Sequence, residues 1–258
     1  MARKADLPRI IFLDMEGTLL RKEHRLDDGR VAPSAWTLLA ERIGPDCLKA
    51  ENETKERWRS QGYPSYLEWM RETVEIHRRF ALGERLFSEV MRSVEFTPGV
   101  DEALRQIHGW GAVSVLITGG FKALADRVQR RLRIMHAFAG CEYFFDPESH
   151  LIQHVNLLPA DEVGKVDFMR LMCREYCVSP RDCAFVGDGM NDRHLAEQVG
   201  FSLAFNAQPE LVAVASASIS QGHGQEDFLA VAEVIEKDFK MRKPSDNDDT
   251  NIPEPGKS

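Results

Sequence analysis

The pattern of apolar and polar positions alternates between short apolar runs and longer amphipathic stretches. Four runs have the length and composition of buried strands, and each ends in a cluster of Gly, Asp or Thr: Ile10–Leu13, Val113–Ile117, Cys183–Val186 and Phe201–Phe205. A helical periodicity follows each run except the last. Strands that alternate with helices form parallel sheets covered on both faces, so the pattern predicts a doubly wound, mostly parallel α/β sheet.

The amphipathic stretches predict the helices of this fold. Helical spacing of apolar residues is found over Asp101–Trp110, Lys122–Leu132, Lys165–Tyr176, Asp192–Val199 and Gln225–Phe239. The segment Phe144–Val155 instead predicts a hairpin around a Pro-Glu-Ser turn.

Residues 24–95 differ from the rest, because they combine helical periodicity with few β-branched residues and hold Trp36, Trp58 and Trp69. They predict an inserted helical cap with a small core of its own and an apolar surface. The α/β core then comprises residues 1–23 and 96–240. Residues 241–258 contain three prolines and almost no apolar side chain, which predicts a disordered tail.

Composition narrows the function classes. The 258 residues carry 33 basic and 41 acidic side chains, a net charge of −8, and no long basic run, which disfavours nucleic acid as a partner. No apolar stretch is long enough for a membrane span or a signal peptide. Five sparse cysteines without a CxxC pair indicate a reducing, cytoplasmic location.

Acidic side chains follow two of the expected strands. Asp14 and Glu16 come directly after the first strand, where ligands bind in open α/β sheets. An ionised Asp14 is suited to nucleophilic attack, and Glu16 to proton transfer. Asp188 and Asp192 follow the third strand, and with Asp14 they offer the oxygen ligands that Mg²⁺ prefers. Each segment taken alone is also consistent with an ordinary strand-to-turn junction.

Two further groups suit an anion. Thr118, Gly119 and Gly120 end the second strand just before a helix, where a hydroxyl and main-chain N–H groups can bind phosphate. Lys165 opens another predicted helix, although a single lysine is usually a solvated surface residue.

The set and order of these groups resemble the haloacid dehalogenase-like superfamily of phosphohydrolases, and within it the phosphoserine phosphatase-like group. The motifs that carry the resemblance are Asp14–Thr18, "ITGGF" (Ile117–Phe121), Lys165, "VGDGMND" (Val186–Asp192) and "AFNAQP" (Ala204–Pro209). The resemblance covers about residues 8–23 and 96–235, is weak in the insert, and implies a Rossmann-like core whose active site lies under a cap.

The resemblance also implies a Mg²⁺-dependent phosphatase that acts on a small phosphorylated metabolite. In such an enzyme Asp14 attacks phosphorus to form an aspartyl-phosphate, while Glu16 protonates the departing alkoxide and later activates water. The resemblance further implies Mg²⁺ held by Asp14, the main-chain carbonyl of Glu16 and Asp188, with Asp192 nearby. Thr118, Gly119, Gly120 and Lys165 are then expected around the phosphoryl oxygens, with Asn191 orienting an acid or the nucleophile.

The chain departs from that group at several positions. Glu16 stands where most members have Asp, and its extra methylene moves the carboxylate by roughly 1 Å. Glu23, nine residues after Asp14, matches a glutamate that can meet a substrate ammonium, but it is equally consistent with a surface acid. The arginine that binds the substrate carboxylate in that group aligns with Thr73, and Arg71 lies two residues away. The insert's aromatic residues Trp58, Tyr63, Tyr66 and Trp69 indicate either cap packing or an aromatic surface near the entrance.

Two other functions fit the same residues. The aspartyl-phosphate of a phosphotransferase passes to an acceptor alcohol instead of water, and a phospho-ligand binding module needs no chemistry at all. A homodimer formed through the aromatic-rich insert is a further hypothesis.

Overall fold

The computed structural model describes residues 7–222 and 224–241 of the chain. Its centre is one seven-stranded sheet with the order β4-β3-β2-β1-β5-β6-β7. The strands are β1 (Ile10–Leu13), β2 (Val113–Phe121), β3 (His136–Phe145), β4 (Ile152–Leu157), β5 (Cys183–Gly187), β6 (Phe201–Phe205) and β7 (Ala217–Ile219). All neighbouring strands are parallel except β3 and β4, which confirms the expected doubly wound, mostly parallel α/β fold.

Helices cover both faces of the sheet because the strands alternate their side chains between two cores. In β1, Ile11 and Leu13 join one apolar cluster while Ile10 and Phe12 join the other. The first cluster also receives α5 (Val100–Gly109), α6 (Lys122–Leu132) and α10 (Leu229–Met241). The second receives α7 (Val163–Glu175), α8 (Arg193–Ala196) and α9 (Pro209–Val212).

Several predicted boundaries differ from the structure. The hairpin around residues 144–155 is confirmed as β3 and β4, but β3 begins as early as His136 and its first half pairs in parallel with β2. The helix expected from Asp192 is a single α-helical turn after a 3₁₀ turn, and α10 starts four residues later than expected. Of the predicted tail, Met241 belongs to α10, and residues 242–258 lie outside the described part of the chain.

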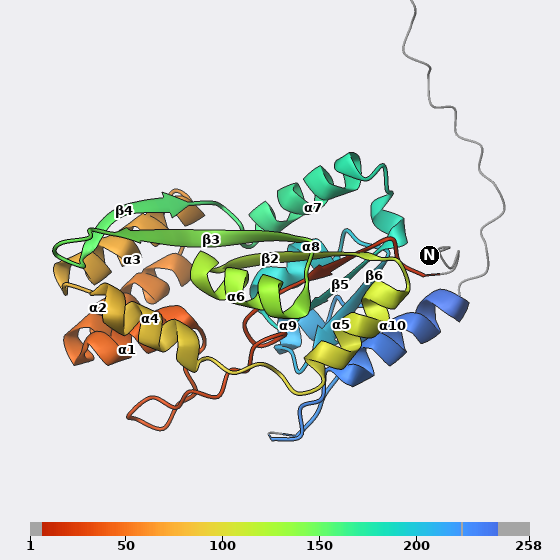
Figure 1. Ribbon diagram of the computed structural model, residues 1–258, viewed down its shortest axis with the longest axis horizontal. Helices are drawn as coiled ribbons and strands as arrows, with labels where there is room; N and C mark the ends of the chain where they lie inside the picture. Colours follow the sequence, from red (N-terminus) through yellow and green to blue (C-terminus); the bar gives the residue numbers. More distant parts are fainter. Residues whose placement is uncertain (1–6, 223, 242–258) are drawn as a thin grey trace, which may run out of the picture.

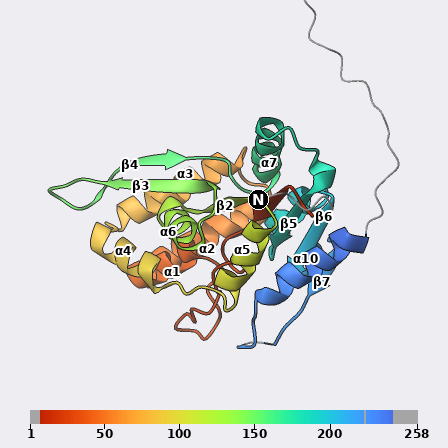
Figure 2. The ribbon, with the colours of Figure 1, turned by 45° about the vertical axis from the view of Figure 1, so that its right-hand side comes forward.

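The segment between β1 and α5 is helical, as its periodicity predicts. It contains α1 (Ala35–Ile43), α2 (Pro45–Arg59), α3 (Tyr66–Arg79) and α4 (Glu84–Ser93). In Figures 1 and 2 these helices gather below the projecting ends of β3 and β4. Ala40, Cys47 and Ile76 form a small separate cluster, but most buried apolar residues of these helices belong to the same cluster as the sheet.

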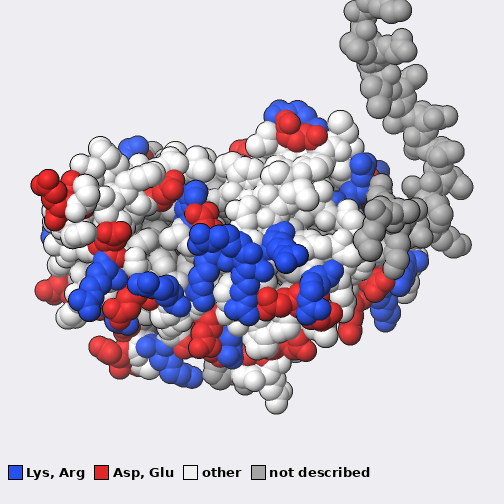
Figure 3. Space-filling view, in the orientation of Figure 1, with Lys and Arg blue, Asp and Glu red and all other residues white. Residues whose placement is uncertain are grey.

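The surface carries both signs of charge. On the face shown in Figure 3, acidic and basic side chains are interspersed, with a group of Lys and Arg over α6. Among the described residues, no helix is both long and apolar enough to cross a membrane.

Candidate active site

The site lies at the carboxyl ends of β1, β2 and β5. The chain leaves β1 toward β2 on one side and continues through β5 to β6 on the other, so β1 and β5 flank the point where the strand order reverses. Side chains that follow these strands therefore meet at the crevice where open α/β sheets bind ligands. Asp14 follows β1 and Asp188 follows β5. The main-chain N–H of Asp14 donates to the carbonyl of Val186 in β5 at 2.9 Å, which holds Asp14 beside that strand.

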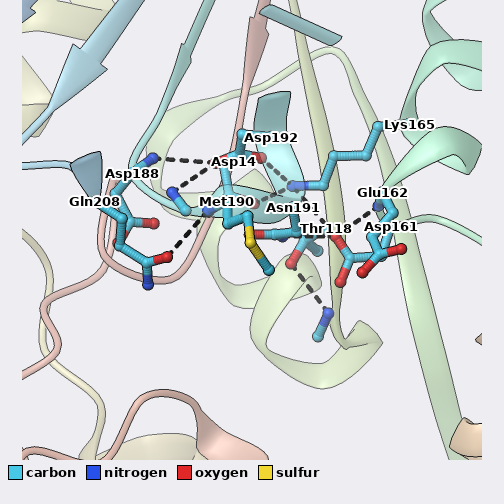
Figure 4. Close-up of polar contacts among 12 residues, drawn as sticks. Asp14, Thr118, Asp161, Glu162, Lys165, Asp188, Met190, Asn191, Asp192 and Gln208 are labelled. Carbon is cyan, nitrogen blue, oxygen red and sulfur yellow. Dashed lines mark hydrogen bonds and ion pairs between the residues drawn. The ribbon is translucent and has the colours of Figure 1, made fainter. Parts of the chain in front are cut away.

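Lys165 is at the centre of the site (Figure 4). Its side chain is fully buried, and Nζ lies 2.6 Å from Asp14 Oδ1, 2.6 Å from Asp192 Oδ1 and 3.7 Å from Asp161 Oδ1. Burial alone would lower the pKa of Lys165, but the three carboxylates outweigh it and hold the pKa well above its ordinary value. The charged ammonium is therefore the favoured form in this site, where it can attract an anion.

Asp14 is a buried carboxyl among like charges. Burial, followed by the charges of Asp192 and Asp188, raises its pKa well above the ordinary value, against the opposing effect of Lys165. Burial therefore disfavours the ionised form of Asp14. A cation bound beside Asp14 would favour that form and lower the pKa again.

Asp192 fixes the loop after β5. Its Oδ2 accepts the main-chain N–H groups of Asp188 and Gly189, each at 3.0 Å, while Oδ1 accepts Lys165. A Cβ at Gly187 would lie 2.3 Å from Asp192 Oδ2, so only glycine lets this carboxylate reach the loop. With both oxygens engaged by the protein, Asp192 serves to position Lys165 and Asp188.

Lys22 was missed from the sequence. Its Nζ lies 2.5 Å from Asp188 Oδ2. A Cβ added at Gly17 would lie 2.7 Å from Lys22 Cε, so the glycine leaves room for the lysine side chain. The residue immediately after it, Glu23, was the candidate instead. Glu23 pairs with Arg21 and lines a smaller cavity of about 170 Å³, outside the main one described below.

Glu16 contacts the insert through its carboxylate. Its Oε1 accepts the main-chain N–H of Ala35, the first residue of α1, at 2.6 Å. Burial raises the pKa of Glu16 despite that hydrogen bond, and a raised pKa favours the protonated form that a general acid needs. The glutamate side chain therefore has a partner in the insert that accounts for its length.

Thr118, Gly119 and Gly120 form a bulge within β2. The sequence instead predicts that the strand ends before them and that they form a turn. The register between β2 and β3 shifts between Thr118 and Phe121, and Thr118 Oγ1 accepts the N–H of Gly120 at 3.1 Å. Bulges redirect side chains near active sites. Here the bulge brings Thr118 and the two glycines to the cavity that contains Asp14 and Glu16.

Asp161, also missed, joins the insert to the core. Its Oδ1 accepts Asn191 Nδ2 at 2.6 Å and its Oδ2 accepts the Tyr66 hydroxyl at 3.3 Å. A Cβ added at Gly119 would lie 2.6 Å from the Tyr66 hydroxyl oxygen. The Tyr66 side chain, from α3 of the insert, therefore reaches the bulge itself. Asp161 carries no local motif, because its role depends on α3 lying opposite.

The donor set fits a divalent cation. One carboxylate oxygen each from Asp14, Asp188 and Asp192 lies within 4.8 Å of the other two, and all three residues are buried. Hard oxygen ligands of this kind suit Mg²⁺. Since both oxygens of Asp192 are already hydrogen-bonded, Asp14 and Asp188 are the side chains available to hold the ion.

A cavity of about 700 Å³ lies between the insert and this cluster. Asp14, Glu16, Thr118 and Asp188 line its core side, and aromatic side chains of the insert line the other. Trp36, Trp58, Tyr66 and Trp69 belong to that lining, whereas Tyr63 is outside it and donates to Glu72. Three of the four aromatic residues that the sequence singles out therefore line the cavity.

Known proteins share this sequence pattern. A family model for haloacid dehalogenase-like hydrolases matches residues 8–200. The phosphoserine phosphatase of Archaeoglobus fulgidus is 26% identical over 235 residues, which are 91% of this chain and 62% of that protein. The phosphoserine phosphatase of Lactococcus lactis is 27% identical over 152 residues, 59% of this chain and 68% of that protein.

Solved structures share the fold. A phospho-aspartyl intermediate analogue of phosphoserine phosphatase has a TM-score of 0.69 and 18% identity, with 88% of this chain and 99% of that chain covered. A hydrolase from Salmonella enterica serovar Typhi has a TM-score of 0.71 and 17% identity, with 91% and 74% covered. The match to the family model covers three quarters of the chain and includes every site residue from Asp14 to Asp192. The chain therefore belongs to the haloacid dehalogenase-like hydrolase family and is phosphoserine phosphatase-like within it.

Proposed function

We propose that the protein is a Mg²⁺-dependent phosphatase that hydrolyses a small phosphomonoester through an aspartyl-phosphate on Asp14. The observation that carries the proposal is the ion cluster in which Lys165 bridges Asp14 and Asp192 beside Asp188. The relatives named as phosphoserine phosphatases support the phosphomonoester class, although the chain spans less than two thirds of the archaeal one.

In this proposal the protein's own groups position and neutralise the phosphoryl group. Lys165, the Thr118 hydroxyl and the main-chain N–H of Gly119 surround its oxygens, while Gly120 orients Thr118 through its own N–H. Charge stabilisation of this kind dominates phosphoryl transfer. A Mg²⁺ ion held by Asp14 and Asp188 would supply a second positive charge to those oxygens. The main-chain carbonyl of Glu16 and the loop held by Asp192 complete the expected metal environment.

Glu16 and Asp14 divide the covalent chemistry. A carboxylate oxygen of Asp14 forms a bond to phosphorus as the bond between phosphorus and the alcohol oxygen breaks. The departing alcohol oxygen takes the proton of Glu16. In the second half, Glu16 removes a proton from water, the water oxygen bonds to phosphorus, and Asp14 is released. Asn191, which donates to Asp161, orients that acid at the edge of the cavity.

We also propose the division of the chain into a core of residues 1–23 and 96–240 and a cap of residues 24–95, because α1, α2 and α3 contribute the side of the cavity that faces the core site. A cytoplasmic location fits the cysteines, which are all free, one of them exposed. Sedimentation would test the homodimer hypothesis.

The test of the proposed activity is hydrolysis of p-nitrophenyl phosphate with and without Mg²⁺. We expect activity that requires the ion and that Asp14→Asn abolishes, because the amide oxygen is a poor nucleophile. Asp101→Asn, which alters an exposed acid on α5, is the matched control and should leave the rate unchanged. Equal rates for the wild type and Asp14→Asn would contradict the proposal.

A further inference from the structure

The charges around the main cavity are unequal. Among its described lining residues, seven are acidic: Asp14, Glu16, Glu51, Asp161, Glu162, Asp188 and Glu210. Three are basic: Lys22, Lys55 and Arg59. Even with Lys165 beneath the floor and a divalent cation added, the phosphoryl group itself brings negative charge. Acidic side chains therefore outnumber basic ones on the cavity lining that a leaving group would contact.

Two of the three bases already have acidic partners. Lys22 lies 2.5 Å from Asp188, and Lys55 lies 2.8 Å from the buried carboxylate of Glu51. Arg59 is exposed at the last residue of α2. None of these described bases is placed as an unpaired cation deep in the cavity, where a carboxylate on the leaving group would need one.

The positions expected to recognise an amino acid are occupied differently. Thr73 lines the cavity where the relatives' carboxylate-binding arginine aligns, and its hydroxyl donates to the carbonyl of Trp69. Arg71 is 59% exposed and pairs with Glu68 on the same helix. Among the described residues that line this cavity, the single arginine is therefore the exposed Arg59, and position 73 offers a hydroxyl in place of a guanidinium.

Aromatic rings form the wall beside these acids. Trp58 and Trp69 stack with centroids 5.0 Å apart, and Tyr66 stands at 77° and 84° to them. Trp58 Nε1 donates to Glu162 at 3.1 Å and the Tyr66 hydroxyl to Asp161, so acid groups adjoin the ring edges. All three side chains are only partly buried. Aromatic faces joined to carboxylates are a binding arrangement for organic cations.

We infer that the substrate is a phosphomonoester whose alcohol carries a protonated or quaternary amine and no carboxylate. The inference rests on the proposed phosphatase activity and concerns the leaving-group end of the same site. The amine lies against Trp58, Tyr66 and Trp69 with Asp161 and Glu162 as counter-charges. The cavity volume of about 700 Å³ leaves room for amines bulkier than ethanolamine.

The test compares esters that differ in one group. O-phosphoethanolamine is L-phosphoserine without its carboxylate, n-propyl phosphate lacks the amine as well, and phosphocholine carries a quaternary amine. We expect kcat/KM for phosphoethanolamine or phosphocholine to exceed that for phosphoserine and for n-propyl phosphate by at least about ten-fold. Equal or faster hydrolysis of phosphoserine would overturn the inference, most directly if Arg59→Ala abolished that hydrolysis.

Variants assign the preference to the aromatic wall. Trp58→Leu should lower kcat/KM for the preferred amine ester by about five- to thirty-fold, and for n-propyl phosphate much less. Tyr63→Leu removes an aromatic ring of the insert outside the cavity and should leave the ratio unchanged. An unchanged ratio in Trp58→Leu overturns the inference.

Hydrolysis of p-nitrophenyl phosphate separates this inference from the proposed function. If that ester is hydrolysed in an Asp14-dependent manner without any preference for amines, only the inference fails. If no ester is hydrolysed, both fail.

Discussion

Individual side chains in this site have roles that depend on which partner each one reaches. Glu16 differs from an aspartate by one methylene, and that length lets its carboxylate accept the N–H of Ala35 at the start of α1. Glu16 is thereby linked to the helical insert as well as to the strand that precedes Asp14. An aspartate at the same position would leave that N–H without this acceptor.

The role of Glu16 is testable by its dependence on the leaving group. General acid catalysis contributes about 10²- to 10⁴-fold, and it matters most when the leaving alkoxide is strongly basic. Glu16→Gln should therefore reduce kcat/KM, which reports the step that releases the alcohol, by about 100-fold or more for an alkyl phosphate and clearly less for p-nitrophenyl phosphate. Equal losses of kcat/KM with the two esters would exclude proton donation by Glu16.

Lys165 supports stability as well as charge. Removing one partner of a buried ion pair leaves an uncompensated charge, which costs about 3–5 kcal/mol. Lys165→Met leaves Asp14 and Asp192 facing each other, so the free energy of unfolding should fall by that amount at neutral pH, measured by denaturant titration. The loss should shrink in mild acid, where the freed carboxyls bind protons.

An exposed pair provides the comparison. Lys240 lies 2.7 Å from Glu236 on the surface of α10, and such pairs contribute little. Lys240→Met should change the free energy of unfolding by about 0.5 kcal/mol or less. A similar effect of both lysine variants would contradict a special role for the buried cluster.

At the level of elements, the contact between β2 and β3 shapes the bulge formed by Thr118, Gly119 and Gly120. A Cβ at Gly140 on β3 would stand 2.6 Å from the carbonyl oxygen of Gly119 and 2.9 Å from its carbon. These are main-chain atoms, which cannot move aside as a flexible side chain can. Glycine at position 140 therefore allows β3 to approach the bulge closely.

Gly140→Ala tests this contact. The added methyl should push Gly119 out of place, lower kcat/KM for p-nitrophenyl phosphate by at least about ten-fold and cost roughly 1–3 kcal/mol of stability. Gly109→Ala is the matched control, because no atom lies within 4 Å of its added Cβ, and it should retain wild-type kinetics. Full activity in Gly140→Ala would show that the bulge does not depend on this approach.

For the whole molecule, the acidic site couples stability to pH and to divalent cations. Burial is the first cause that raises the pKa values of both Asp14 and Asp188 above the ordinary value of 3.8. Carboxyls with raised pKa values in the folded state stabilise the fold most when protonated. Their contribution is complete below the unfolded-state pKa and is lost as pH rises through the folded-state values.

Mg²⁺ should reverse this loss. With excess MgCl₂ the melting temperature should rise by several degrees at neutral or alkaline pH, since binding at about 100 times Kd adds about 2.7 kcal/mol. The increase should be smaller in mild acid, where protons compete for Asp14 and Asp188. Asp188→Asn should remove most of the increase in scanning calorimetry, and an increase that does not depend on Asp188 would place the ion elsewhere.

Strands and helices were predictable where the local pattern was strong. Ile10–Leu13 and Phe201–Phe205 are continuous apolar runs, and both are strands with the predicted bounds. The sequence does not predict the first half of β3, because that half is a strand through its parallel pairing with β2 and shows no strand periodicity of its own. The helix expected over Asp192–Val199 is observed as α8, which begins one residue later, after the turn in which Asp192 binds the loop N–H groups, and ends three residues earlier.

Apolar periodicity and strand-end motifs are local, so the sequence alone predicts four strands, one hairpin, the helices inserted after the first strand and the candidate chemical groups of the site. The partners of those groups, and the parallel pairing of β3 with β2, depend on the tertiary structure. Lys22, Asp161 and Tyr66 come to the site from segments far apart in the chain, whereas Glu23 pairs with Arg21 and lines the smaller neighbouring cavity. Such meetings depend on how the insert packs over the sheet, which no local pattern encodes.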